Sequence, residues 1–326
     1  MAATARLLHN AGMDFFILLL GGAVLGLVGV LVRLAGDAGV GPFASAFWRM
    51  ALATPVLVGW ALWAARAAAN KALAAAPIAA ATADPAPQVR LEWRKAAPPQ
   101  LLGGWPQWAL IALAAGMFAG DLILYHLGLF WSTVANATLE SNLAPIVITL
   151  ALWALTRIAP RPVFLLGLAC ALAGALLMIG PHMEHSRALL GDICGVTSAL
   201  FYAGYQVSVQ QARQRLDTLP LMAWVTAGAT LALLPFALLE GRIWPTAPIG
   251  WVWLAGLALL VQIGGQVVIA YAVKHLSPAL SSVGLLVQPA TSAVYAWALL
   301  GEGLGNWQLA GAGLVLAGIY LARRGM

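Results

Sequence analysis

Apolar residues occupy this chain in long runs that are separated by short polar or charged connections. A helical run of about 20 residues crosses roughly 30 Å of hydrocarbon, and the sequence divides into ten runs of about this length. The pattern therefore predicts ten transmembrane helices. The predicted spans are 13–34, 43–65, 105–125, 134–155, 163–180, 189–211, 221–239, 249–273, 279–300 and 307–322.

The two halves of the chain repeat each other. When the sequence is shifted by 144 residues, the stretch 132–145 falls on 276–289, and a proline ends each copy. A shift of 178 residues aligns the earlier parts of the halves, beginning with Asp14 and Asp192. The difference, 178 − 144 = 34 residues, is the excess length of one connection in the first half. Self-similarity at a fixed offset indicates a duplicated unit.

We expect two units, residues 1–180 and residues 181–326. The first includes an Ala/Pro-rich cytoplasmic linker at about 66–104, which cannot bury a core and is at best partly helical. Each unit has five spans, an odd number, so the second must cross the membrane upside down relative to the first. The predicted fold class is an all-α integral membrane protein with ten transmembrane helices in an inverted five-plus-five repeat.

The composition agrees with a membrane protein, since 62% of the residues are hydrophobic and 9% are charged. The mean hydropathy of +0.88 is far from that of soluble domains. If the N-terminus is cytoplasmic, 13 of the 17 Lys and Arg residues fall on the cytoplasmic side, which predicts cytoplasmic termini. The net charge of +6 thus reflects topology, and we expect no binding of nucleic acid.

Among the ionisable and amide residues that interrupt the apolar spans of the first half, four are candidate binding groups. Arg49 lies in the second span, Asp121 in the third, and Glu140 and Asn142 in the fourth. Charged groups that face lipid are costly, so these side chains should face the protein interior or water. Arg49 has three open interpretations: it reaches the headgroups, forms a fixed ion pair with Asp121 or Glu140, or holds a substrate carboxylate.

The second half carries polar side chains of another kind. Tyr202 and Gln206 share a helical face in the sixth span, with Tyr205 beside them, and Gln266 and Gln288 follow in later spans. Such residues either join helices by hydrogen bonds or line a pore. We predict that they line one water-filled cavity with the acids, and that the tyrosines, including Tyr271 and Tyr295, supply its flat walls. Pro145 and Pro289 should kink their helices and act as hinges.

Catalytic and metal-binding patterns are weak. Cys170 and Cys194 both lie within spans and predict no disulfide, and the loop sequence His182-Met-Glu-His185 lacks the spacing and further ligands of a metal site. His126, at the outer end of a span, has no accompanying nucleophile motif, and no phosphate-binding loop occurs. We expect no enzyme activity, no cofactor and no metal, and energy supplied by a gradient of substrate or ion.

The order of these features resembles the EamA family of the drug/metabolite transporter superfamily. The resemblance rests on the ten spans, on Ala-Phe-Trp-Arg49, on a mid-helix proline in each half and on Gly301-Glu302 before the last span. One departure is plain, because the family's Gly-Glu is replaced in the first half by Arg157-Ile158. The resemblance implies export of small metabolites across the bacterial inner membrane, and a subgroup of the family exports aromatic amino acids.

The sequence therefore predicts a secondary transporter that works by alternating access. Asp121 aligns with Gly265 and Glu140 with Gly284, so only the first repeat carries these acids. If the fold itself required them, both repeats should have them, so their asymmetry is better explained by a substrate site. The expected cargo is an amino acid with a large or aromatic side chain. The alternatives are a nucleoside or a drug-like lipophilic cation, and more distantly a channel or an intramembrane enzyme. The expected partners are this small molecule and the bilayer, and the chain is expected to act as a monomer.

Overall fold

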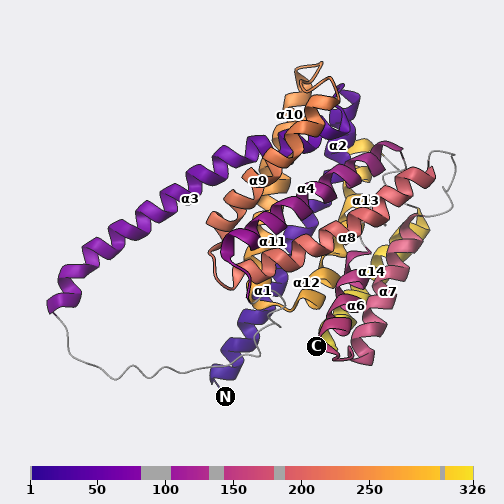
Figure 1. Ribbon diagram of the computed structural model, residues 1–326. Helices are drawn as coiled ribbons and strands as arrows, with labels where there is room; N and C mark the ends of the chain where they lie inside the picture. The colour runs from indigo at the N-terminus through magenta and orange to yellow at the C-terminus, as the bar shows by residue number, and fades with distance from the viewer. Residues whose placement is uncertain (1, 82–103, 132–142, 180–187, 302–304, 326) are drawn as a thin grey trace.

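In this computed structural model, the described residues are 2–81, 104–131, 143–179, 188–301 and 305–325. They form helices, with no strand in these ranges. Figure 1 shows the helices gathered into one bundle, from which the later part of α3 projects. The elements are α1 (Ala2–Leu25), α2 (Leu27–Asp37), α3 (Pro42–Ala81), α4 (Gln107–Trp131), α6 (Ala144–Thr156), α7 (Pro162–Ile179), α8 (Ala188–Arg213), α9 (Thr218–Leu239), α10 (Ile249–Gly256), η1 (Leu257–Val267), α11 (Val268–Ala272), η2 (Val273–His275), α12 (Pro278–Gly284), α13 (Val287–Leu300) and α14 (Asn306–Arg324).

The chain is a multi-pass membrane protein. In the described ranges, five helical segments are long and apolar enough to cross a membrane. Large apolar side chains cover the outside of the bundle, as Trp108 (73% exposed) and Leu239 (84% exposed) illustrate, and such a surface suits lipid and not water. The five segments are Met13–Asp37, Pro42–Asn70, Gln107–Trp131, Thr218–Leu239 and Ile249–His275. Helices overlap each of the ten predicted spans, while the inverted repeat itself stays a prediction.

Two predicted spans are interrupted helices. The first span divides between α1 and α2 at Gly26, where an added Cβ would lie 2.9 Å from the backbone nitrogen of Ser292 in α13. The ninth divides between α12 and α13 at residues 285–286. Leu285 is four residues before Pro289, the position whose carbonyl a proline ring displaces. The predicted kink at Pro289 is thus a complete break.

Pro145 lies at the start of the described helix α6. It occupies the first turn of α6, where a proline costs no helical hydrogen bond. Residues 132–142, which lead into α6, lie outside the described ranges, so the kink expected at Pro145 stays a prediction.

The eighth predicted span contains an irregular helical segment. Its central part, η1, is a π-helix that carries both Gln262 and Gln266. π-helical turns are rare and frequently occur at functional sites. No pattern in the sequence indicated this geometry.

Helices from the two halves pack against each other. α4 packs on α8, α1 on η1, α3 on α9 and α7 on α14. Glycine permits the closest of these approaches: a Cβ added to Gly174 of α7 would lie 2.6 Å from the Gly311 oxygen of α14. One added to Gly318 would lie 2.6 Å from the Gly167 oxygen. α7 and α14 therefore contact along their backbones.

The linker in the first half is partly helical where it is described. α3 continues to Ala81, well past the end of the predicted span at 65. The extension is rich in alanine, the residue that favours helix most strongly. Residues 82–103, the rest of the predicted linker, lie outside the described ranges.

Candidate functional site

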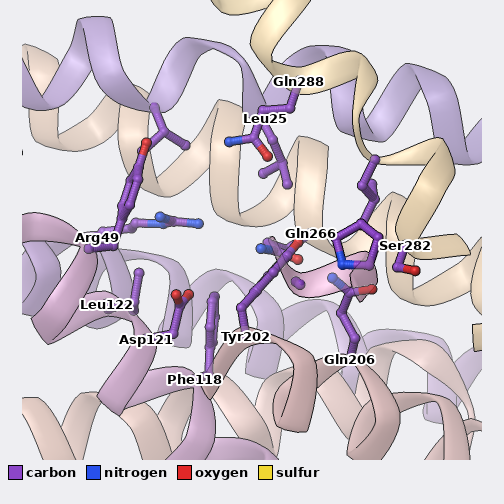
Figure 2. Close-up of a pocket in the computed structure, with 15 residues that line it drawn as sticks. Leu25, Arg49, Phe118, Asp121, Leu122, Tyr202, Gln206, Gln266, Ser282 and Gln288 are labelled. Atoms are coloured by element: carbon purple, nitrogen blue, oxygen red, sulfur yellow. The ribbon is translucent and has the colours of Figure 1, made fainter. Parts of the chain in front are cut away.

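One cavity lies at the centre of the bundle, where side chains from both halves converge (Figure 2). About 540 Å³ of space lies among its lining side chains, and this figure includes space that is open to solvent. Polar and charged groups enter it from α3, α4, α8, η1, α12 and α13, between apolar groups from α1, α2 and α4. The lining residues are Leu25, Val28, Arg49, Phe118, Asp121, Leu122, Tyr125, Ala144, Pro145, Tyr202, Gln206, Gln266, Ser282, Leu285 and Gln288.

Arg49 projects into this cavity from α3 and is only 2% exposed. One terminal nitrogen donates to Gln262 Oε1 at 3.4 Å, and the Gln262 amide in turn donates to Thr226 Oγ1 at 3.1 Å. The guanidinium carbon lies 5.7 Å from the centre of the Phe118 ring. Its Nε finds no hydrogen-bond acceptor in the described part of the protein. The guanidinium is thus held in place with donors still available for an anion.

Asp121 enters the cavity from α4, opposite the side chain of Arg49 (Figure 2), and is 7% exposed. One carboxylate oxygen accepts a hydrogen bond of 2.6 Å from Ser198 Oγ of α8. No nitrogen of Arg49 comes within 4.0 Å of an Asp121 oxygen, so the two do not form an ion pair. A charge buried without a direct counterion is costly, which favours binding of an oppositely charged group here.

Aromatic rings form one wall of the cavity. Phe118 stacks on Tyr205 with ring centres 4.3 Å apart, and Tyr205 lies 5.9 Å from Tyr202. The Tyr205 hydroxyl donates to Gln266 Oε1 at 3.4 Å. Phe118 and Tyr202 face the cavity, and Tyr205 supports them from behind. This wall presents ring surface beside two charged groups.

The structure brings together six of the residues that the sequence marked as substrate-binding. These are Arg49, Asp121, Tyr202, Gln206, Gln266 and Gln288. Tyr205, which the sequence also marked, stacks on Phe118 and does not itself line the cavity. Glu140 and Asn142 lie outside the described residues. Of the two proposed hinges, Pro145 lines the cavity and Pro289 does not.

The expected contribution of two further tyrosines is wrong. Tyr271 and Tyr295 do not line the cavity, and Tyr271 is 49% exposed. Tyr271 lies on an exposed helix face, and Tyr295 lies two helical turns beyond Gln288 of the lining. Aromatic residues in a membrane helix often face lipid or its interface, and their type alone does not separate that role from a binding role.

Sequence reasoning missed Phe118 and Ser198. Phe118 precedes Asp121 by three residues and therefore shares its helical face, a spacing that marks it as a neighbour. Ser198 precedes Tyr202 and Gln206 at intervals of four, so it extends the polar stripe of α8 by one turn. Both signals were present, but apolar and small polar residues are too common in this chain to stand out.

A second buried polar pair lies apart from the cavity. His126 Nδ1 is 2.7 Å from Ser45 Oγ, which also donates to the Pro42 carbonyl at 3.0 Å. Both side chains are at most 1% exposed, and neither lines the central cavity. A Ser–His contact suggests nucleophilic catalysis, but a substrate cannot reach one that is sealed between helices. The pair joins the start of α3 to α4.

Comparison with known proteins points to membrane transport. Residues 189–324 match the family described as the EamA-like transporter family. An uncharacterized transporter of Archaeoglobus fulgidus is 25% identical over 288 residues, which are 86% of this chain and 87% of that protein. The pseudopaline exporter CntI of Pseudomonas aeruginosa is 28% identical over 205 residues, 62% of this chain and 70% of that protein. These relatives are transporters and not enzymes.

The fold also has a counterpart among solved structures. A protein crystal structure matches with a TM-score of 0.66 at 18% sequence identity, and the match covers 97% of this chain and 98% of the other. This likeness concerns the arrangement of the helices. It extends over both halves of the chain, including the first half, which the family match does not reach.

Proposed function

We propose that this protein is an EamA-like secondary transporter that exports amino acids with large or aromatic side chains from the cytoplasm by alternating access. The observation that carries the proposal is that Arg49 and Asp121 present opposite charges to one cavity without pairing. The location is the bacterial inner membrane, with both termini cytoplasmic, and the acting unit is a monomer.

A zwitterionic amino acid suits this pair of charges. Its carboxylate would accept hydrogen bonds from the Arg49 guanidinium, and its ammonium would donate to the Asp121 carboxylate that Ser198 orients. Charge-assisted hydrogen bonds are about twice as strong as neutral ones. Binding such a molecule therefore offsets the cost of burying both side chains.

The neighbouring groups favour a cargo with a large side chain. Phe118 and Tyr202 offer flat apolar surface within the same cavity, and aromatic faces pair well with rings. The amides of Gln206, Gln266 and Gln288 complete the lining and provide both donors and acceptors. If Glu140 and Asn142 also face the cavity, as we propose, they add a second acid and a further amide.

The packing supports the proposed inverted five-plus-five repeat, an arrangement that many alternating-access transporters have. In that repeat, with units 1–180 and 181–326, α7 corresponds to α14 and α3 to α9, and each of these pairs is in direct contact. The glycine contacts are reciprocal, because Gly167 meets Gly318 while their repeat partners, Gly311 and Gly174, meet each other. Such a reciprocal pattern is what a two-fold axis between the two proposed units would produce. Transporters built in this way bind their cargo near the midplane between the repeats.

A lipophilic cation is the second candidate cargo. Asp121 together with the Phe118 and Tyr202 rings is a combination that holds cations. Arg49 argues against it, since a fixed positive charge in the same cavity repels a cation. A nucleoside would use the rings and amides but would need neither charge.

Counterflow in proteoliposomes tests the proposal. Purified protein is reconstituted and loaded with unlabelled compound, and uptake of labelled amino acids, nucleosides and cationic dyes is measured. We expect saturable exchange of large neutral amino acids. Uptake of dyes alone that is unchanged by Arg49→Ala would move the assignment to drug export, and flux that does not saturate would indicate a channel.

A further inference from the structure

A second, larger cavity lies between the end of α6 and the helices α7, α12 and α14. Its empty volume is about 1190 Å³. It is bounded by the last turns of α6, the connection 157–161, the first turn of α7, the start of α12 and the end of α14. This cavity is separate from the central one, and the two share no lining residue.

Its lining is apolar apart from a few hydroxyl groups and one arginine. Leu152, Trp153, Ile158 and Phe164 are its large apolar residues, and Arg161 is the charged residue of the described lining. Trp153 is 50% and Ile158 75% exposed, so the cavity opens to the surroundings of the protein and not only toward its interior. In a bilayer those surroundings are lipid.

The mouth of this cavity is basic. Arg157, the C-cap of α6, lies between two lining residues, Thr156 and Ile158, and Arg161 follows four residues later. Arg157 and Arg161 are both exposed. Arg157 has φ 57°, a left-handed conformation that residues other than glycine seldom adopt, and it ends α6 so that the chain turns around the cavity. No acidic residue lines the cavity in the described ranges.

These features fit one class of molecule. An apolar cavity does not hold ordered water well. An acyl chain that fills such a cavity is removed from water and leaves no empty space beside the apolar side chains. Basic pockets between membrane helices on the cytoplasmic side bind anionic headgroups. Trp153 at the rim is placed as interfacial aromatic residues are. We propose that this cavity binds an anionic phospholipid, with an acyl chain inside it and the phosphate held by Arg157 and Arg161.

The bound lipid would contact the helices that also form the central site. On α6, Pro145 lines the central cavity and Thr149, one turn later, lines the second. On α12, Ser282 lines the central cavity and Ala279 lines the second. The lipid therefore stabilises the observed placement of α6 against α12 and thereby the shape of the central cavity.

Native mass spectrometry tests this site without measuring transport. Its result therefore does not depend on whether the proposed function is correct. The wild type is released from nanodiscs that contain phosphatidylglycerol or phosphatidylcholine with the same acyl chains, and the lipid that stays bound is counted. We expect preferential retention of phosphatidylglycerol. Arg157→Ala and Arg161→Ala should each lower that preference about fivefold, the effect of one basic residue near an anionic lipid surface.

Two matched variants sharpen the result. Arg242→Ala removes an exposed arginine elsewhere in the chain and should leave the preference unchanged. Ala159→Trp places bulk at an exposed lining position and should reduce retention of both lipids. Equal retention of the two lipids by the wild type, or an unchanged preference in the Arg157→Ala/Arg161→Ala double variant, would overturn the proposal.

A water-filled vestibule is the competing use of this cavity. To test it, Cys170 and Cys194 are replaced by serine and Ala279 by cysteine, and the protein in lipid is exposed to a hydrophilic thiol reagent that does not cross membranes. We expect little labelling, because lipid fills the cavity. Rapid labelling at position 279 that added phosphatidylglycerol does not slow would contradict the lipid site.

Discussion

The Arg49 guanidinium and the Asp121 carboxylate enter one cavity from adjacent helices, yet they do not pair with each other. Each is instead held by a neutral side chain, Arg49 by Gln262 at 3.4 Å and Asp121 by Ser198 at 2.6 Å. Of the interpretations that the sequence left open for Arg49, a fixed ion pair with Asp121 is thus wrong. Among the described residues neither charge has an ionic partner, so both remain available to a bound molecule.

Pro289→Ala should slow transport. Without the proline ring, residues 285–289 can form regular helix, which favours a straight ninth span by up to about 3 kcal/mol. The variant should then remain in one access state and lose most of its counterflow. Pro235→Ala is the control, since Pro235 lies inside α9, a continuous helix. Equal rates in both variants and the wild type would show that the break is not a hinge.

Gly318→Ala should destabilise the contact between α7 and α14. The added Cβ would lie 2.6 Å from the Gly167 oxygen, so the helices must separate, at a cost of about 1–3 kcal/mol. Gly313→Ala on the same helix is the matched control, because nothing lies within 4 Å of the added atom there. Thermal unfolding in detergent measures the difference. Because alanine favours helix more than glycine does, Gly313→Ala should keep or raise the stability, and equal stability of the two variants would contradict the contact.

Glu240 tests the link between the end of α9 and the start of α3. Its carboxylate accepts hydrogen bonds from Ala44 N at 2.7 Å and Phe43 N at 3.4 Å, so it caps α3 from the other half of the chain. Glu240→Ala should lower the free energy of unfolding by about 1 kcal/mol, as loss of a cap does. Glu240→Gln keeps one acceptor and should cost less.

The same cap should show a pH dependence. Burial raises the pKa of Glu240, although the backbone hydrogen bonds from Ala44 and Phe43 oppose this effect. An acid whose pKa is higher in the folded state stabilises the fold at low pH and loses that contribution as the pH rises through the folded pKa. The stability of the wild type relative to Glu240→Gln should therefore fall as the pH increases. A rise over that range would show that the charged form is the better cap.

The sequence predicted the site residues that break an apolar pattern. Asp121 and Gln266 are polar groups in membrane helices, and the cost of exposing them to lipid requires that they turn inward. No such rule applies to Phe118, since an apolar residue can face either lipid or the protein interior, and its type does not predict which. Its role arises from the tertiary contact with Tyr205, which one sequence does not contain.

The helical interruptions were predictable to different degrees. Pro289 predicted an irregularity in the ninth span, because proline has no backbone N–H to donate and its ring clashes with the carbonyl four residues earlier. The division at Gly26 lies where Ser292 approaches from a distant part of the chain, and the π-helix around Gln262 packs against α1 and α3. Long-range contacts of this kind leave no local sequence pattern.

The central claim is that Arg49 and Asp121 together recognise a zwitterion. Counterflow of a labelled aromatic amino acid tests it most directly when the unlabelled amino acid, its methyl ester and its N-acetyl derivative compete for the wild type, Asp121→Asn and Arg49→Ala. Arg242→Ala and Asp37→Asn, which change exposed charges, are the controls. We predict that the intact amino acid alone competes well, and that each site variant loses affinity about 10- to 100-fold, as expected for one hydrogen bond to a charged group. Competition by the ester as strong as that of the amino acid, with Arg49→Ala as active as the wild type, would contradict the claim.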